Sequence, residues 1–243
     1  MITVTILTKN CSRTLKRTLE SLGTFSEVLI LDSGSTDDTL AIASHFSNVT
    51  CHEEDIFTGF GPMHNMAAAL ASYDWILSID GDESLSPALI DELNNLALDP
   101  NCVYSLPRHN YYNQKHIKWC AGWHPDRVVR LYNRTKTRFS DDLVHEKILK
   151  LNEVKLHAPL IHTPYLETSD FLSKMQHYTT LFAKQHPGKP RSFLSILLHS
   201  WFAFFKSYIL KGGIFGGKEG YIISSYNAQT TFYKYLKQAE KEL

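Results

Sequence analysis

The stretch that decides the fold is WILSIDGDES, residues 75–84. Its first half is a mostly apolar run with the length of a buried strand, and its second half places Asp80, Asp82 and Glu83 around one glycine. Carboxylates that crowd at the end of a buried strand repel one another and lose hydration, so they cost stability unless a partner compensates. The stretch therefore predicts a strand that delivers clustered carboxylates to a ligand.

Apolar runs alternate with helical patterns around this strand. Strand patterns cover 3–7, 27–31 and 75–79, and segments with a helical apolar stripe lie between them and after them. Strands that alternate with helices predict a parallel sheet with right-handed crossovers. The sequence thus favours an α/β fold, with a Rossmann-like, mostly parallel sheet flanked by helices.

The pattern changes beyond residue 100. Short strand patterns separated by polar and aromatic loops predict a mixed-sheet half, and they lie at 103–107, 127–132 and 147–151. A helical stretch, a Pro- and Gly-bearing break and a second helical region follow. We expect a globular body at 1–168, divided into halves at 1–100 and 101–168, and a helical C-terminal extension at 169–243.

The charges are unevenly divided along the chain. Lysine plus arginine equals aspartate plus glutamate at 25 each, yet residues 171–243 carry ten basic and only three acidic side chains. A basic tail on an acidic body suggests contact with an anionic surface, either phospholipid or nucleic acid. The four cysteines lie far apart without Cys-x-x-Cys spacing, which argues against a zinc ribbon or a disulfide framework. Without a signal-peptide pattern at the N-terminus, we expect a cytoplasmic protein.

The tail contains the apolar segment FLSILLHSWFAFFKSYIL, residues 193–210, whose length is at the lower limit for crossing a bilayer. Ser195, His199 and Lys206 fall on one stripe of a helical wheel. This pattern favours a helix that lies in the membrane interface, and the alternative is a helix packed on the body or on a second subunit. Because basic residues are interleaved with apolar ones, we expect no nucleic-acid partner. The segment at 212–220, GGIFGGKEG, predicts a hinge or turn.

Two acids follow predicted strands directly. In an open parallel sheet, ligands bind beyond the carboxyl ends of the strands, so we expect Asp32 and Asp80 at the same edge. Carboxylates suit Mg²⁺ or Mn²⁺, which bind through one or two such groups together with substrate phosphates. For the Asp80–Asp82 motif alone, the alternative is a solvated Asp-Gly turn. The loop at 32–39, DSGSTDDT, is either a tight turn or a place for a nucleotide base or ribose.

Five blocks of this sequence occur in the order of a known family. TVTILTKN, DSGSTDDT and GFGPMHNMAAALASYDWILSIDGDE resemble the donor half of family 2 glycosyltransferases with the GT-A fold. WHPDRVVRLYNR at 123–134 and DDLVHE at 141–146 narrow the resemblance to bacterial lipopolysaccharide inner-core glycosyltransferases that add a β-glucose to heptose. The resemblance covers about residues 1–165. It implies a nucleotide-sugar half at 1–100 and an acceptor half at 101–168.

The resemblance also implies roles for single residues on the donor side. Thr8, Asn10 and Asp32 would line the uridine pocket, and Asp80 would face the ribose and the metal. Asp82 would bind the metal.

Further metal ligands and diphosphate contacts follow from the same resemblance. His162 and His145 are candidates for a histidine ligand of the metal. Pro62 and His64 stand where close relatives supply basic side chains. Neutralisation of the diphosphate would then fall on the metal, with Arg130, Arg127 or Lys9 as helpers.

On the acceptor side, the resemblance implies inversion at the sugar carbon, so a carboxylate must take the proton from the attacking hydroxyl. Glu146 is the first candidate for this base, and Asp142 and Asp141 are the alternates.

The expected function is metal-dependent, inverting transfer of a hexose, glucose by resemblance, from a UDP-sugar to a lipid-linked lipopolysaccharide core oligosaccharide, with heptose as the acceptor sugar. The enzyme would be peripheral on the cytoplasmic face of the bacterial inner membrane. One alternative is a sugar-phosphate nucleotidyltransferase, which would need a glycine-rich basic loop where TKNCSRT stands. The other is a non-catalytic domain that binds nucleotide or membrane. The sequence makes no prediction of the oligomeric state.

Overall fold

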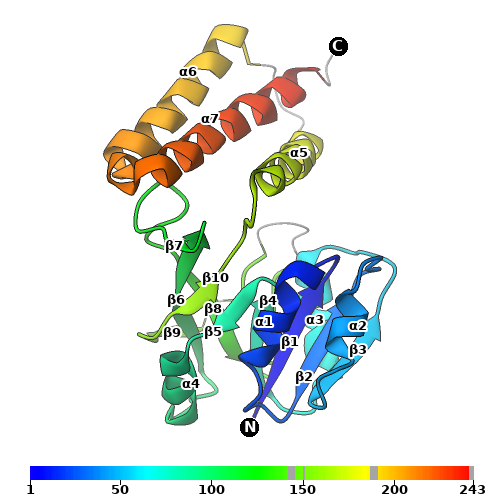
Figure 1. Cartoon of the computed structure of the whole chain (residues 1–243). Helices are drawn as coiled ribbons and strands as arrows, with labels where there is room; N and C mark the ends of the chain where they lie inside the picture. Colours follow the sequence, from blue (N-terminus) through cyan, green and yellow to red (C-terminus); the bar gives the residue numbers. More distant parts are fainter. Residues whose placement is uncertain (142–145, 150, 187–190, 241–243) are drawn as a thin grey trace. The chain divides into compact units, whose positions relative to one another are not determined.

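The computed structural model of the 243-residue chain describes residues 1–141, 146–149, 151–186 and 191–240 (Figure 1). Asp142 and His145 lie outside the described residues. The chain divides into two compact units. The first unit comprises Met1–Arg108 and Arg127–His162, and the second comprises His109–Asp126 and Thr163–Leu243.

The first unit is built on one sheet in which β1 (Ile2–Thr8) is central. β2 (Val28–Asp32) and β4 (Trp75–Asp80) flank β1 in parallel, and β3 (Val49–Glu53) continues the parallel sheet beside β2. On the other side of β4, β8 (Arg127–Asn133) runs antiparallel, and β6 (Cys102–Tyr112) runs antiparallel to β8. The parallel half confirms the expected α/β architecture, and the antiparallel strands make the rest of the sheet mixed.

Three short strands complete the far side of the sheet. β10 (Leu160–His162) pairs antiparallel with β5 (Glu83–Leu85), and β9 (Asn152–Lys155) pairs with β6. The full order is β3-β2-β1-β4-β8-β6-β10-β5. In the second unit, β7 (Lys115–His116) forms a short hairpin with the end of β6.

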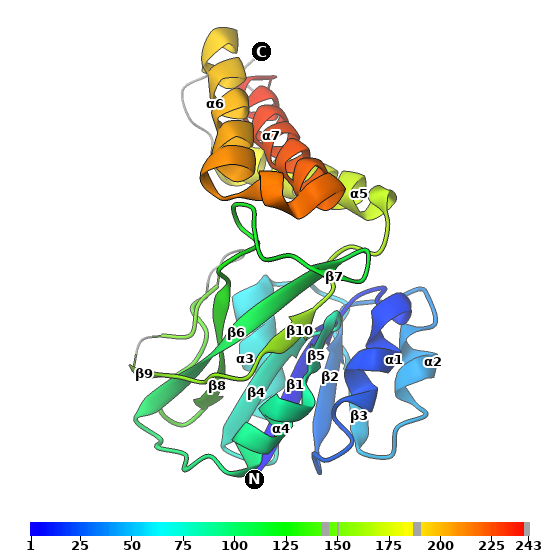
Figure 2. The same ribbon diagram turned by 60° about the vertical axis from the view of Figure 1, so that its left-hand side comes forward.

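Helices cover both faces of the parallel strands (Figures 1 and 2). Along β1 and β2, Val4, Ile6, Val28 and Ile30 pack with Leu15 and Leu19 of α1 (Ser12–Glu20), and this cluster also takes in α2 (Thr39–Ala43) and α4 (Pro87–Asn94). The alternate residues Leu29 and Leu31 pack with Met63 and Ala67 of α3 (Phe60–Leu70). Because both faces are covered, β2 is apolar up to Asp32 and β1 combines apolar residues with buried threonines, and both patterns were recognisable as strands in the sequence.

Gly81 joins the end of β4 to α1. Its carbonyl oxygen accepts hydrogen bonds from Thr14 Oγ1 at 2.8 Å and from Thr18 Oγ1 at 3.1 Å. A Cβ atom at this position would lie 2.9 Å from Cys11 Sγ, closer than van der Waals contact allows. Glycine at position 81, between Asp80 and Asp82, therefore lets the end of β4 pack closely against α1.

One predicted strand differs from the structure, and three short strands were not predicted. Among 147–149 and 151, which the structure describes, no residue lies in a strand; Ile148 makes an isolated bridge with Phe139, and a strand follows at β9. All four residues of β9 are exposed, so its sequence carries no apolar alternation. β5 and β10 have three residues each, which is too short for a periodic pattern.

The second unit is a helical assembly. It contains α5 (Thr168–Gln185), α6 (Phe193–Phe205), a π-helical turn η1 (Lys206–Leu210), a 3-10 turn η2 (Gly213–Gly216) and α7 (Gly217–Glu240). α6 and α7 lie side by side (Figures 1 and 2). A Cβ on Gly220 would lie 1.8 Å from Gly213 O, so the backbones touch here. The predicted hinge at 212–220 is therefore a turn only as far as Gly216.

Trp123 and Trp119 have different environments. Trp123 is buried and stacks on Tyr165 and Phe171, in a cluster that also includes Ile223 of α7. Trp119 is 41% exposed. Trp123 therefore belongs to the core of the second unit.

We predict that Gly81→Ala destabilises the protein by about 1–3 kcal/mol, because the added methyl group displaces Cys11 or separates β4 from α1. The measurement is urea unfolding followed by circular dichroism. Gly23→Ala is the control, since a Cβ there meets nothing nearer than Glu20 O at 3.9 Å. Equal stability of the two variants would show that the close approach at Gly81 is not needed.

Candidate functional site

The two acids that end β2 and β4 lie at one edge of the sheet. In the parallel register, Thr8 of β1 is paired with Asp32 and its neighbour Leu7 is paired with Asp80. Asp32 and Asp80 therefore flank the end of β1, one on each side. This confirms the expectation that both carboxylates reach the carboxyl edge of the parallel strands, where open α/β sheets bind ligands.

Asp32 is fully buried and is satisfied by its own chain. Oδ1 accepts hydrogen bonds from Thr8 Oγ1 and Ser35 Oγ, both at 2.6 Å. Oδ2 accepts from the backbone N–H groups of Gly34 at 3.1 Å and Ser35 at 2.7 Å. Since a carboxylate has about four acceptor positions, these bonds use its capacity. Asp32 therefore stabilises the conformation of the loop after β2.

Asn10 ties this loop to the loop after β1. Its side-chain Oδ1 accepts from the Thr36 backbone N–H at 2.7 Å, and its own backbone N–H donates to Ser35 Oγ at 2.8 Å. Asn10 has φ 51°, a left-handed conformation that asparagine tolerates better than most residues. Asn10 is exposed, so the bridged loops present a surface at the carboxyl edge.

Asp37 fixes the next part of the same loop. Its carboxylate accepts from the backbone N–H groups of Thr39 at 3.0 Å and Ser12 at 3.1 Å. Burial alone would raise the pKa of Asp37, but the hydrogen bonds from Thr39 and Ser12 outweigh it and lower the pKa to about 2. The loop therefore keeps a negative charge at the start of α1 and α2.

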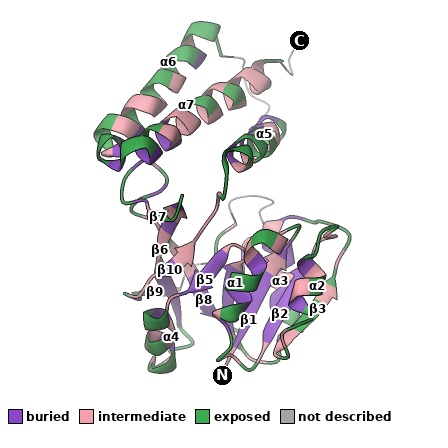
Figure 3. Ribbon diagram, in the orientation of Figure 1, coloured by how far each residue is buried: buried purple, intermediate pink, exposed green. Residues whose placement is uncertain are grey.

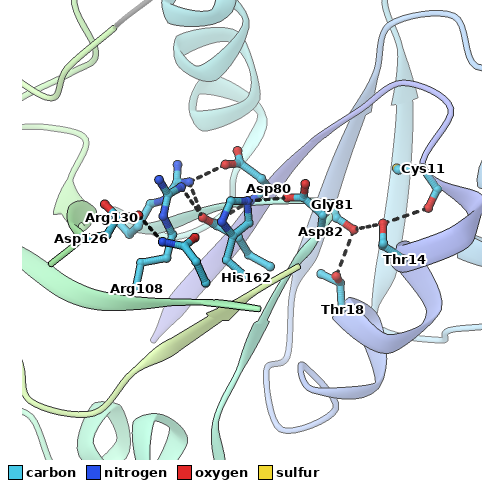
Figure 4. Close-up of polar contacts among 12 residues, drawn as sticks. Cys11, Thr14, Thr18, Asp80, Gly81, Asp82, Arg108, Asp126, Arg130 and His162 are labelled. Atoms are coloured by element: carbon cyan, nitrogen blue, oxygen red, sulfur yellow. Dashed lines mark hydrogen bonds and ion pairs between the residues drawn. The ribbon is translucent and has the colours of Figure 1, made fainter. Parts of the chain in front are cut away.

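The acid cluster after β4 is held by two arginines (Figure 4). Glu83 of β5 is completely buried, and its Oε1 accepts from Arg130 Nη2 at 2.7 Å and from Arg108 Nη1 at 3.0 Å. Its Oε2 accepts from the backbone N–H of Asp80 at 3.0 Å. Arg130 Nη2 also donates to Asp80 Oδ2 at 2.5 Å. Arg130 thus bridges Asp80 and Glu83 and compensates the crowding of acids in the sequence.

The electrostatics of this network keep both partners charged. Burial raises the pKa of Asp80, but the Arg130 guanidinium outweighs burial, and the net pKa lies well below the ordinary aspartate value. Burial likewise disfavours the charge on Arg130, and Asp80 and Glu83 outweigh it, so the pKa of Arg130 is raised. The carboxylate of Asp80 is therefore ionised, with one oxygen held by Arg130.

Asp82 faces His162. The pairing of β10 with β5 sets His162 opposite Glu83, the residue after Asp82. His162 Nε2 lies 3.5 Å from Asp82 Oδ1, and the side chains are 13% and 23% exposed. Donor atoms at adjacent corners of an octahedron, each about 2.1 Å from Mn²⁺ or Mg²⁺, lie about 3 Å apart. The Asp82–His162 pair is close to this spacing, and a shift of about half an ångström would let both bind one divalent cation.

The protein alone offers such a cation few ligands. Within the described ranges there is no group of three or more His, Cys, Asp or Glu side chains placed to hold a metal. A cation at Asp82 and His162 would complete its coordination with water and substrate oxygens, as Mg²⁺ commonly does at phosphate-binding sites.

Glu146 lies beside a buried histidine. Its Oε1 is 3.9 Å from His64 Nε2, and Glu146 itself is half-buried. His64 Nδ1 lies 3.0 Å from Ser78 Oγ, and the ring stacks on Phe139 at 4.4 Å. Burial lowers the pKa of His64 to about 4, so the ring is neutral near pH 7. His64 therefore supplies no positive charge. This agrees with the sequence analysis, in which His64 stands where close relatives have a basic side chain.

The alternate bases are placed differently. Asp141 forms a two-point ion pair with Arg138, at 2.5 and 2.8 Å, and its side chain is 65% exposed. Asp142 lies outside the described residues. Glu146 is thus the one of the three that the structure places half-buried beside another potential site residue.

The roles of three site residues were not predicted from the sequence. They are Glu83 and Arg108, which belong to the salt-bridge network, and His64, which is buried beside Glu146. Glu83 directly follows the Asp-x-Asp motif. The available signal was this crowding of acids in the sequence, because a third acid in such a turn needs cationic partners. Arg108 lies in β6 without any motif around it. His64 was noticed only as a missing basic residue.

The sequence is similar to a family of glycosyltransferases and to individual glycosyltransferases of bacteria. The sequence model of the family described as "Glycosyl transferase family 2" matches residues 3–150. An uncharacterized glycosyltransferase of Rickettsia conorii is 26% identical over 100% of this chain and 91% of its own length. The lipopolysaccharide core biosynthesis glycosyltransferase LpsC of Rhizobium meliloti is 27% identical over 86% of this chain and 80% of its own.

Two solved structures show the same fold. The mannosyltransferase PcManGT of Pyrobaculum calidifontis, in complex with GDP-Man and Mn²⁺, matches 99% of this chain and 86% of its own, with a TM-score of 0.54 and 17% identity. S. aureus TarS 1-349, in complex with UDP-GlcNAc, matches 99% of this chain and 91% of its own, with a TM-score of 0.50 and 13% identity. These likenesses confirm the expected GT-A type of α/β fold.

We predict that Glu83→Gln costs about 3–5 kcal/mol of unfolding free energy, because it removes the buried negative charge that Arg130 and Arg108 share. Urea unfolding gives the value. The matched control is Glu20→Gln, whose exposed partner Lys16 is 3.9 Å away and whose loss should cost less than about 1 kcal/mol. Similar small losses in both variants would show that the buried network does not stabilise the fold.

Proposed function

The chain belongs to glycosyl transferase family 2, and from this premise we propose a specific transfer reaction. The enzyme moves a hexose, glucose in the simplest case, from a UDP-sugar to heptose of a lipid-linked lipopolysaccharide core oligosaccharide, with inversion and with a divalent cation. The observation that carries this proposal is the meeting of Asp80, Asp82 and His162 at the edge of one sheet, in the unit that also holds Glu146.

The donor class is supported by the carboxyl edge of the sheet and by the solved relatives. TarS was solved with UDP-GlcNAc and PcManGT with GDP-Man, and both are nucleoside diphosphate sugars. In this chain Thr8, Asn10 and the loop shaped by Asp32 would form the uridine pocket. Because the Asp32 carboxylate accepts four internal hydrogen bonds, we propose that it acts through the loop.

We propose Asp82 and His162 as the protein ligands of Mg²⁺ or Mn²⁺. The cation would neutralise the diphosphate as it leaves the sugar. Asp80 would face the ribose and the same cation with the oxygen that Arg130 does not hold. Arg130 is bonded to Asp80 and Glu83, so its contribution to donor binding would be to fix the orientation of Asp80.

On the acceptor side, we propose Glu146 as the general base. It takes the proton from the acceptor hydroxyl while the oxygen forms a bond to the anomeric carbon and the bond to UDP breaks, with the electron pair leaving on UDP. If Ser78 donates its hydroxyl hydrogen to His64 Nδ1, the remaining Nε2–H of neutral His64 points toward Glu146. His64 would then be a positioning residue for the base.

The relative LpsC supports the proposed acceptor, since its name places that protein in lipopolysaccharide core biosynthesis. A core oligosaccharide is carried on lipid, so the enzyme would work peripherally at the cytoplasmic face of the bacterial inner membrane. Residues 1–100 would serve the donor, 101–168 the acceptor and 169–243 the membrane.

The proposed metal site predicts that Asp82→Asn abolishes the effect of Mn²⁺ on UDP binding. Calorimetry on the wild type should show that the affinity for UDP rises at least tenfold when Mn²⁺ is added. This size is the lower end of the roughly 10- to 100-fold effects that single supporting groups have at metal sites. In Asp82→Asn the two affinities should coincide. Asp74→Asn is the control, because this acid is 60% exposed and pairs with Arg134. A Mn²⁺ effect that survives in Asp82→Asn would refute the ligand assignment.

The proposed base predicts that Glu146→Gln retains UDP binding and loses about 10²- to 10⁴-fold in transfer rate. Release of UDP from UDP-glucose in the presence of a core oligosaccharide acceptor measures the rate. Asp141→Asn should remain within a fewfold of wild type, because its carboxylate is paired at the surface. The opposite result, a large loss in Asp141→Asn only, would assign the base to Asp141.

A further inference from the structure

The second unit carries an exposed apolar face. It comprises Phe193, Leu198, Trp201 and Phe202 of α6, Leu210 of η1 and Phe215 of η2, each more than half exposed. Figure 3 shows exposed residues along α6 and the turns that follow it. The values reach 63% for Trp201 and 75% for Phe215. Soluble proteins rarely leave such a patch in water, and patches of this kind mark contact with a partner or a membrane.

The opposite side of α6 is already occupied by α7. Ile196 is buried, and Ser200 Oγ donates a hydrogen bond to Ala228 O at 2.9 Å. Farther along, Ser224 Oγ donates to Ser207 Oγ at 3.0 Å. The inner side of this segment thus packs against α7 and forms hydrogen bonds with it. The apolar face is the side that stays exposed.

The charge around the apolar face selects an anionic partner. From Phe171 to Lys218 the chain contains no aspartate or glutamate and seven lysines and arginines. Lys206 and Lys211 are exposed on either side of Ile209 and Leu210. A cationic margin around aromatic and aliphatic side chains matches an anionic bilayer, whose head groups attract lysine while its acyl region takes up the apolar groups.

The geometry favours a helix that lies in the membrane plane. Phe193–Leu210 is long and apolar enough to cross a membrane by length and composition alone, and only 11% of the segment is buried. Together with η1 the helix has 18 residues, or about 27 Å, slightly less than the roughly 30 Å of the hydrocarbon core. The chain then turns at Gly212, which has a left-handed φ of 69°. His199 and Lys206 also lie within the segment.

We propose that the apolar face of α6, η1 and η2 binds an anionic phospholipid bilayer by lying in the head-group boundary of one leaflet, with α7 on the aqueous side. Trp201 would sit at the level of the head groups, where tryptophan is enriched. The inference deepens the proposed function by naming the surface that would hold the enzyme near a lipid-linked acceptor. It rests on the proposed function only in the choice of a membrane relevant to that acceptor.

The test is sedimentation of the full-length protein with vesicles of phosphatidylcholine, with and without phosphatidylglycerol. Wild type should bind the phosphatidylglycerol vesicles strongly and pure phosphatidylcholine vesicles weakly. Leu198→Glu should weaken binding at least tenfold, because it places a charge in the middle of the apolar face. Lys206→Glu with Lys211→Glu should remove most of the preference for phosphatidylglycerol.

The matched control is Leu70→Glu, at an exposed leucine of α3 in the first unit, and it should bind as wild type does. Unchanged binding by Leu198→Glu would overturn the proposal. So would a wild-type dimer that Leu198→Glu dissociates while neither protein binds vesicles, since the face would then join two copies of the chain. Retention of wild type in cell membranes after alkaline carbonate extraction would overturn the in-plane geometry.

A separate readout keeps this test independent of the proposed function. Hydrolysis of UDP-glucose in solution reports on the first unit and should be unchanged in Leu198→Glu. A protein that binds vesicles as predicted but never turns over a nucleotide sugar would contradict the proposed function and leave the membrane inference in place.

Discussion

The site depends on the salt-bridge network that Arg130 forms with Asp80 and Glu83. Crowded carboxylates at the end of a buried strand repel one another, and here a buried guanidinium donates to two of them while Arg108 supports Glu83 from β6. The cost of burying these charges is offset because each has a partner at hydrogen-bond distance. Asp82, two residues beyond Asp80, faces His162.

The network also links distant parts of the chain. Glu83 lies in β5, Arg108 in β6 and Arg130 in β8, so three strands of the mixed half are tied to the end of a parallel strand. This explains why the mixed half belongs to the site as well as to the sheet. In the proposed reaction, the same arrangement would fix Asp80 before any substrate arrives, which is the kind of preorganisation that electrostatic catalysis requires.

The sequence predicted the centre of the parallel half well because β1, β2 and β4 are mostly buried and their sequences are dominated by apolar and β-branched residues. Asp32 and Asp80 could be placed at one edge from strand ends alone. Glu83 and His64 could not be interpreted, because their roles depend on partners distant in the sequence: Glu83 on Arg108 and Arg130, and His64 on Phe139 and Glu146. The short strands β5, β9 and β10 were missed because they are defined by pairing and not by a local pattern.

The loop after β2 has a consequence for donor choice. A carboxylate whose acceptor positions are all filled by its own chain has none to spare for a visiting base, and Asp32 is in this condition. Discrimination between one nucleobase and another would then rest on main-chain groups and on the size of the residues at 33–36. Enzymes built on this loop could diverge in the nucleotide they accept through small changes at those positions, while the acid that organises the loop stays the same.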